Sequence, residues 1–169
     1  ETERARQAIA RPTHYEVMGQ GLLPELGFTL RGKADRIDMD ARGNAHLYDY
    51  KTGAAPSAKE QQFFDKQLLL EAAMVENGAF EALQPRHTER AVYVSLARPP
   101  KEVAARLDEV PAAQVWREFS DLMTRWFDPN RGYTARAALL KENDISDYDQ
   151  LSRFGEWDVT DTAKPEGLE

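Results

Sequence analysis

Two strand-like segments joined by a short turn constrain the fold of this chain more than any other feature. The segment 28–40 reads FTLRGKADRIDMD and the segment 44–52 reads NAHLYDYKT, with turn-forming residues at 40–44 between them. Such a pair predicts an antiparallel β-hairpin. We therefore expect a sheet in which these two strands are neighbours.

Helical and strand-like segments follow one another around this hairpin, and their order indicates the fold class. Short apolar runs predict strands, and apolar residues at a spacing of three and four predict helices. The sequence predicts an α/β (α+β) domain with a small mixed β-sheet flanked by helices. The other expected elements are a first short strand at 14–19, a capping box at Ser57 and Glu60 before a helix at 63–80, a buried strand at 89–97, a helix at about 111–127 and a short helix near 146–153.

The 169 residues correspond in length to one domain. We expect residues 1–169 to form a single domain that is a fragment of a longer subunit. Residues 1–12 are expected to be the end of a preceding helix that Pro12 stops, and residues 128–169 a loop-rich C-terminal extension.

The amino-acid composition excludes several kinds of functional site. The chain has no cysteine, which excludes disulfides, thiolate zinc sites and cysteine-ligated iron–sulfur clusters, and its three histidines lack metal-ligand spacing. The net charge of −7 argues against a simple basic nucleic-acid patch and suits carboxylates gathered around a hard cation. No apolar run approaches the length of a membrane span, and the lack of disulfides suits the cytosol.

The hairpin brings charged side chains together. Because side chains on a strand alternate between faces, Asp49 and Lys51 share one face and Tyr50 projects from the other. The turn brings Asp35 beside Asp49, and two neighbouring carboxylates repel each other unless a cation lies between them. Mg²⁺ binds one or two carboxylates together with phosphate oxygens. This set of residues indicates metal-assisted hydrolysis of a phosphodiester.

A simpler interpretation is a cluster of ion pairs on the surface of a non-nuclease α/β domain. Asp38 illustrates it, because its odd offset from Asp35 turns it to the other face, where we expect a surface or salt-bridge residue. Substitution of Asp38 should then matter little for metal binding. Gly32 interrupts the alternation and indicates a bulge or a close backbone approach.

The stretch GKADRID, then DYKTG, then a glutamine in KQLLLEAAM resembles the PD-(D/E)XK nuclease superfamily in its RecB-like branch. The resemblance implies a restriction-endonuclease-like core. It also implies that Asp35 and Asp49 are metal ligands, with the backbone carbonyl of Tyr50 as a further ligand. Lys51 would be the catalytic lysine, and Gln67 would brace the site or contact DNA.

Three flanking residues extend this implied site, and one position departs from the family pattern. Glu16 on the first strand is a candidate additional acidic metal ligand, with a surface glutamate as the alternative. Lys33 and Arg36 flank the site and are candidates for DNA-backbone contacts. The RecB-like glutamine motif usually reads Q-x-x-x-Y, whereas here the fourth residue after Gln67 is Glu71.

Most of the chain, including YDQLSRFGEWD near its end, resembles the C-terminal nuclease domain of the AddB family in its alphaproteobacterial form. AddB is the B subunit of a bacterial helicase–nuclease. The resemblance implies a cytoplasmic Mg²⁺- or Mn²⁺-dependent exonuclease acting on the 5′-ended single strand of DNA during double-strand break repair and recombination. Its partners would be single-stranded DNA, the rest of its own subunit and the A helicase–nuclease subunit, with no membrane.

Two alternatives stay within the same superfamily. The first is a catalytically silent module that binds DNA or scaffolds its complex. The second is a related exonuclease of recombination or CRISPR adaptation. Many AddB proteins hold an iron–sulfur cluster through four cysteines, and this cysteine-free segment is expected to hold none.

Overall fold

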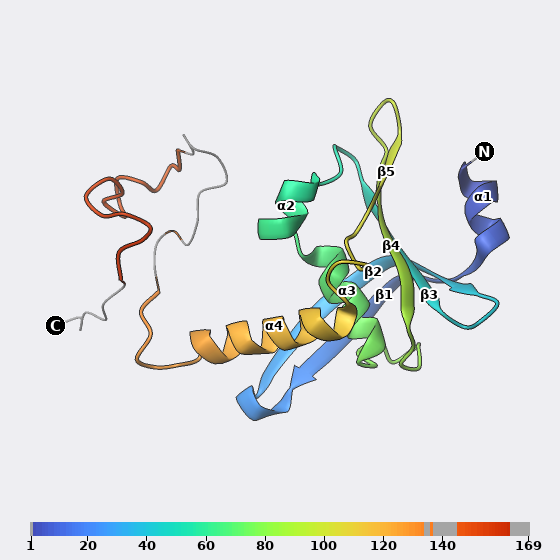
Figure 1. Ribbon diagram of the computed structural model, residues 1–169, viewed down its shortest axis with the longest axis horizontal. Coiled ribbons are helices and arrows are strands. Elements are labelled where there is room, and N and C mark those ends of the chain that lie inside the picture. The colour runs from blue at the N-terminus through green and yellow to red at the C-terminus, as the bar shows by residue number, and fades with distance from the viewer. Residues whose placement is uncertain (1, 134–135, 137–144, 163–169) are drawn as a thin grey trace. The chain divides into compact units, whose positions relative to one another are not determined.

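The computed structural model describes residues 2–133, 136 and 145–162, and these divide between two compact units, Glu1–Asp121 and Leu122–Glu169 (Figure 1). The first unit contains the sheet and all the predicted site residues. None of the helices in the described residues has the length and apolar character needed to cross a bilayer.

A five-stranded mixed sheet forms the centre of the first unit, in the order β1-β2-β3-β4-β5. Neighbouring strands are antiparallel except for β3 and β4, which are parallel and are connected through two helices. The predicted mixed sheet and the hairpin of β2 with β3 are confirmed. The strands are β1 Ala10–Leu23, β2 Phe28–Asp40, β3 Ala45–Lys51, β4 Thr88–Ser95 and β5 Lys101–Ala104.

The helices are α1 Thr2–Ile9, α2 Ala58–Phe63, α3 Gln67–Glu76 and α4 Ala112–Trp126, with a 3₁₀ turn η1 at Pro24–Leu26. The predicted capping box is present, because Ser57 caps the start of α2 and Glu60 bonds back to the Ser57 backbone. The single helix expected at 63–80 is wrong. The chain breaks between α2 and α3, where the Asp65 carboxylate accepts bonds from the Gln67 backbone N–H (3.3 Å) and the Tyr93 hydroxyl (2.6 Å).

The N-terminal boundary also differs from the expectation. The helix ends at Ile9, and Pro12 lies inside β1, which is longer than the strand expected at 14–19. Proline is tolerated there because β1 is an edge strand, and a shift of register follows Pro12. β5 was not expected, and the described residues near 146–153 form turns in place of a short helix.

The two faces of the sheet bury different side chains. On one face Ile37, Leu47 and Tyr93 belong to the main core, together with the apolar residues of α3. On the other face Tyr48 packs with Val92 and Val94 in a smaller cluster. This alternation follows the period of two along each strand. The predicted site therefore lies on one face of the sheet, and the other face makes a different set of contacts.

Close packing against side chains of α3 and of the segment that follows it requires glycine on β1 and β2. Gly19 and Gly32 are cross-strand partners, and a Cβ atom at Gly19 would lie 2.6 Å from the ring of Phe80. A Cβ atom at Gly32 would lie 3.2 Å from the sulfur of Met74 on α3. The close approach expected at Gly32 is therefore confirmed. It brings α3 near the part of β2 that carries Asp35.

Candidate active site

The first carboxylate lies where β2 and β3 separate. The pairing of these strands ends at Arg36 and Tyr48, one position before Asp35 and Asp49 would face each other. The Asp35 Oδ2 atom accepts a bond of 2.9 Å from the backbone N–H of Tyr50. In a strand the N–H and C=O of one residue point to the same side. The Tyr50 carbonyl therefore projects from β3 toward the side on which Asp35 of β2 lies.

Asp49, Lys51 and Gln67 form a closed triangle of polar contacts. The Lys51 Nζ atom lies 2.9 Å from Asp49 Oδ2 and donates a bond of 2.8 Å to Gln67 Oε1. The Gln67 Nε2 atom donates a bond of 2.7 Å to Asp49 Oδ1. The structure thus brings the predicted lysine, one predicted carboxylate and the predicted helix glutamine into direct contact.

Gln67 is well held in this place. It is the first residue of α3, and its backbone N–H is bonded to Asp65. Asp65 is in turn bonded by the hydroxyl of Tyr93, and the Lys51 ammonium lies 5.7 Å from the centre of the Tyr93 ring. The break between α2 and α3 therefore starts the second helix at the position where Gln67 reaches the sheet.

Sequence reasoning treated Glu71 only as a departure from the family motif, yet it lies in the site. Glu71 Oε1 accepts a bond of 3.1 Å from Gln67 Nε2, and the residue is 5% exposed. Burial raises the pKa of its carboxyl to about 7; the nearby Asp49 and Asp35 also raise it, while the Gln67 bond lowers it. The helical spacing of four from Gln67 was the signal that could have found it.

Glu16 and Lys33 pair with each other at the edge of the sheet. They form an exposed ion pair, and the Glu16 side chain is 62% exposed. The bond from Glu16 raises the pKa of Lys33 above its ordinary value. Glu16 lies on β1 between the residues paired to Arg36 and Ala34, hence opposite Asp35, and its φ of 52° bends the strand there. Neither residue contacts the triangle of Asp49, Lys51 and Gln67.

Arg36 lies on the opposite face of the sheet and is not part of this site. It donates two bonds of 2.6 Å to Asp38, and it also bonds to Glu3 and the Tyr50 hydroxyl. Asp38 does face away from Asp35, as expected, and it forms a salt bridge. The expectation of a surface position is wrong, because Asp38 is fully buried.

The arrangement of a carboxylate, a second carboxylate and a lysine on adjacent strands, with a helix glutamine, agrees with the comparison to protein families. The model of the PD-(D/E)XK nuclease superfamily matches residues 1–146. The chain belongs to the PD-(D/E)XK nuclease superfamily. The five-stranded mixed sheet with flanking helices is consistent with the fold of this superfamily. A search of curated proteins returned no match.

Members of the PD-(D/E)XK superfamily generally use divalent metal ions. Among the described residues, no three His, Cys, Asp or Glu side chains are close enough to hold a metal as they stand. Two carboxylates suffice for Mg²⁺ when waters and phosphate oxygens complete its shell. Asp49 Oδ2 is buried with the Lys51 ammonium at 2.9 Å, and the second lone pair of this oxygen can still coordinate a cation. Asp35 and Asp49 therefore fit a hard cation.

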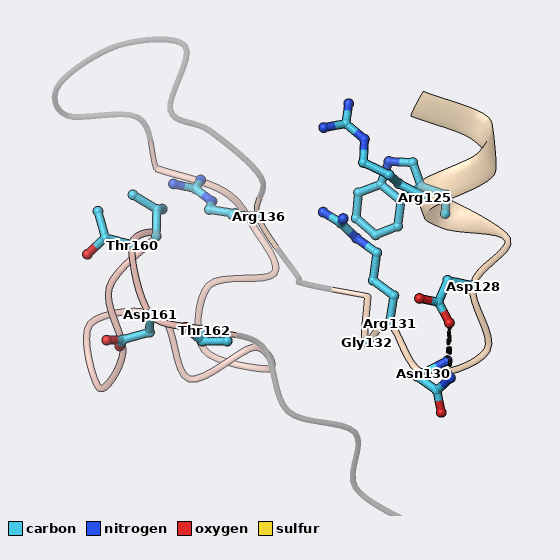
Figure 2. Close-up of a pocket in the computed structure, with 11 residues that line it drawn as sticks. Arg125, Asp128, Asn130, Arg131, Gly132, Arg136, Thr160, Asp161 and Thr162 are labelled. Atoms are coloured by element: carbon cyan, nitrogen blue, oxygen red, sulfur yellow. Dashed lines mark hydrogen bonds between the residues drawn. The ribbon is translucent and has the colours of Figure 1, made fainter. Parts of the chain in front are cut away.

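A pocket of about 580 Å³ lies in the second unit, and it holds none of the predicted site residues. Figure 2 shows Arg125 in the last turn of α4 and Arg131 on the segment that follows, with Asp128 bonded to Asn130 below them. The Arg131 guanidinium lies 4.5 Å from the centre of the Trp126 ring. The pocket lacks the paired carboxylates and lysine of the nuclease pattern.

Proposed function

We propose that this chain is the nuclease domain of an AddB-type subunit. It would hydrolyse phosphodiester bonds of single-stranded DNA, with Mg²⁺ or Mn²⁺ as cofactor, as its complex resects broken DNA ends in a bacterial cytoplasm. The rest of its subunit and the A helicase–nuclease subunit are the proposed partners. The 5′-ended strand as substrate follows from the resemblance to AddB alone.

One observation carries the proposed chemistry, and it is the contact of Lys51 with both Asp49 and Gln67. A surface cluster of ion pairs does not explain it, because Asp49 is only 4% exposed and its partner Gln67 bridges to a second buried carboxyl. Burying carboxylates together costs free energy that folding alone does not require. Function is the usual reason for such an arrangement.

Each residue of the proposed site then has its own task in phosphodiester hydrolysis. Asp35, Asp49 and the carbonyl of Tyr50 would hold a divalent cation, which would polarise the phosphate and make water a better nucleophile at neutral pH. Lys51 would orient the attacking water and offset the negative charge that builds on the phosphate in the transition state. Gln67 would keep the Lys51 ammonium directed toward the scissile phosphate.

The test is a cleavage assay on labelled single-stranded DNA with Mg²⁺, Mn²⁺ or EDTA. Wild type should cleave only with metal, and Lys51→Ala should lower the rate by roughly 100- to 1,000-fold without changing the melting temperature. Lys59→Ala is the matched control, because Lys59 lies on α2 and is exposed. Full activity in Lys51→Ala would refute the assignment of the lysine.

An inactive wild type would favour the catalytically silent module, or a domain that needs its partner. Repeating the assay with the assembled helicase complex separates these two outcomes. Cleavage that appears only in the complex, and is lost in Lys51→Ala, supports the proposed function. Persistent inactivity there supports the silent module.

A further inference from the structure

Glu71 is a buried carboxyl in a helix that otherwise buries apolar residues against the sheet. Its neighbours on α3 include Leu68, Ala72 and Val75, each almost fully buried. An apolar side chain at position 71 would cost less to bury than a carboxyl. Packing of the core therefore gives no reason for an acid at this position.

The Gln67 amide gives such a reason. A carboxamide can rotate by half a turn, which exchanges its oxygen and its nitrogen. In the observed orientation Oε1 faces the Lys51 ammonium, while the two hydrogens on Nε2 are directed to Asp49 and Glu71. The rotated amide would direct its hydrogens at the ammonium and its oxygen at two carboxyl groups.

Of the three partners of the Gln67 amide, Glu71 is the one to which the proposed function gives no contact with cation or substrate. If Asp49 turned toward a cation and Lys51 toward a phosphate, each would weaken its bond to the amide. The bond of Gln67 Nε2 to Glu71 Oε1 would remain and would fix the amide during the reaction.

We propose that Glu71 is a positioning residue for the nuclease reaction, which holds the Gln67 amide with its oxygen toward Lys51. This inference rests on the proposed function for its catalytic consequence, and on the contacts alone for its structural part. The role requires an acceptor oxygen at position 71 and does not depend on a negative charge there. Glu71→Gln keeps such an oxygen, whereas Glu71→Met has similar length and removes it.

The first readout is the ¹⁵N–¹H spectrum of the Gln67 side-chain amide in the metal-free 169-residue chain, assigned through its loss in Gln67→Met. Glu71→Met should shift one of the two amide proton resonances upfield, because one hydrogen bond is lost. Glu71→Gln should leave both near their wild-type positions. Glu76→Met is the matched control, because Glu76 ends the same helix and bonds His87 and Thr88. It should change neither resonance.

The second readout is kinetic. Glu71→Met should lower kcat on single-stranded DNA by about tenfold with KM unchanged, and Glu71→Gln should restore most of the rate. Calorimetric titration with Mn²⁺ should give equal affinities for wild type and Glu71→Gln. A merely structural carboxyl would not produce this loss of kcat with KM unchanged and its rescue by glutamine.

Two results would overturn the proposal. The first is an unchanged Gln67 spectrum in Glu71→Met, which would mean that Glu71 does not hold the amide. The second is loss of Mn²⁺ affinity in Glu71→Gln, which would make the charge essential and Glu71 a metal ligand. If wild type cleaves no DNA even in its complex, the proposed function fails, and the amide spectrum still decides the positioning role.

Discussion

The two faces of the sheet bury charged side chains in opposite ways. On one face Asp38 is fully buried and receives two bonds of 2.6 Å from Arg36, so both of its oxygens are satisfied. On the other face Asp49 is almost as buried, but its two oxygens have separate partners, the Gln67 amide at 2.7 Å and the Lys51 ammonium at 2.9 Å. The rigid guanidinium fork of Arg36 occupies both oxygens of Asp38 at once, whereas the flexible Lys51 side chain can turn away from Asp49.

The partners of Arg36 explain why its face serves structure. The bonds from Arg36 to Asp38, Glu3 and Tyr50 join α1 to β2 and β3. These bonds, first of all that to Asp38, hold the pKa of Arg36 well above its ordinary value. The Arg36 guanidinium therefore keeps its positive charge. Similar residue types thus build a structural pair on one face and the proposed nuclease site on the other.

The largest expected effect comes from removing the charge of Asp35 or Asp49, the two carboxylates proposed as metal ligands. Asp49→Asn and Asp35→Asn should each lower the rate of metal-dependent cleavage by at least about 100-fold, because each removes one anionic ligand. The melting temperature should stay at its wild-type value or rise, since a repulsive charge is lost. Cleavage rates and Mn²⁺ calorimetry check this. Unchanged Mn²⁺ affinity in Asp35→Asn would count against Asp35 as a ligand.

Substitution in the buried pair of Asp38 and Arg36 should have the opposite effect, on stability and not on metal binding. Asp38→Asn should lower the free energy of unfolding by about 3 kcal/mol, because it leaves the Arg36 charge buried with an incomplete partner. Metal affinity and the rate of cleavage per folded molecule should not change. Urea unfolding measures the free energy of unfolding, calorimetry measures metal affinity, and the cleavage assay measures the rate. A stable Asp38→Asn variant with weakened Mn²⁺ binding would reverse the assignment of the two faces.

The buried Glu71 carboxyl should make stability depend on pH. Its pKa of about 7 in the folded chain exceeds the ordinary value of 4.5, so the unfolded chain ionises first as the pH rises. The free energy of unfolding should fall between pH 4.5 and 7, by at most about 3 kcal/mol from this group. Urea unfolding of the metal-free protein in EDTA measures the slope, and Glu71→Gln should flatten it. An equal slope in both proteins would mean that other groups cause the pH dependence of stability.

The smallest effect is expected at the exposed pair of Glu16 and Lys33. Exposed ion pairs add little to stability, so Glu16→Gln should leave the midpoint of urea unfolding unchanged. If Glu16 is an additional ligand, as its position opposite Asp35 suggests, Mn²⁺ affinity should fall, though less than in Asp35→Asn. An unchanged affinity would leave Glu16 as a surface residue.

Local pattern was sufficient for a large part of the fold and the site. The hairpin followed from the alternation in 28–40 and 44–52, and the pairing of Asp35, Asp49 and Lys51 on one side followed from the period of two. The capping box at Ser57 followed from its spacing to Glu60. These features depend on neighbours within a few residues, so the sequence alone carries them.

Other features depended on contacts between distant segments. The break before Gln67 needs the Tyr93 hydroxyl from β4 on Asp65, and no spacing within 57–80 indicates it. Pro12 fits inside a strand only because β1 is at the edge of the sheet. The sequence by itself determined which residues can do chemistry and on which face of each strand they project. Tertiary structure decided how these carboxyl groups are held, because the burial of Asp38 and the bond of Gln67 to Asp49 depend on segments far apart in the chain.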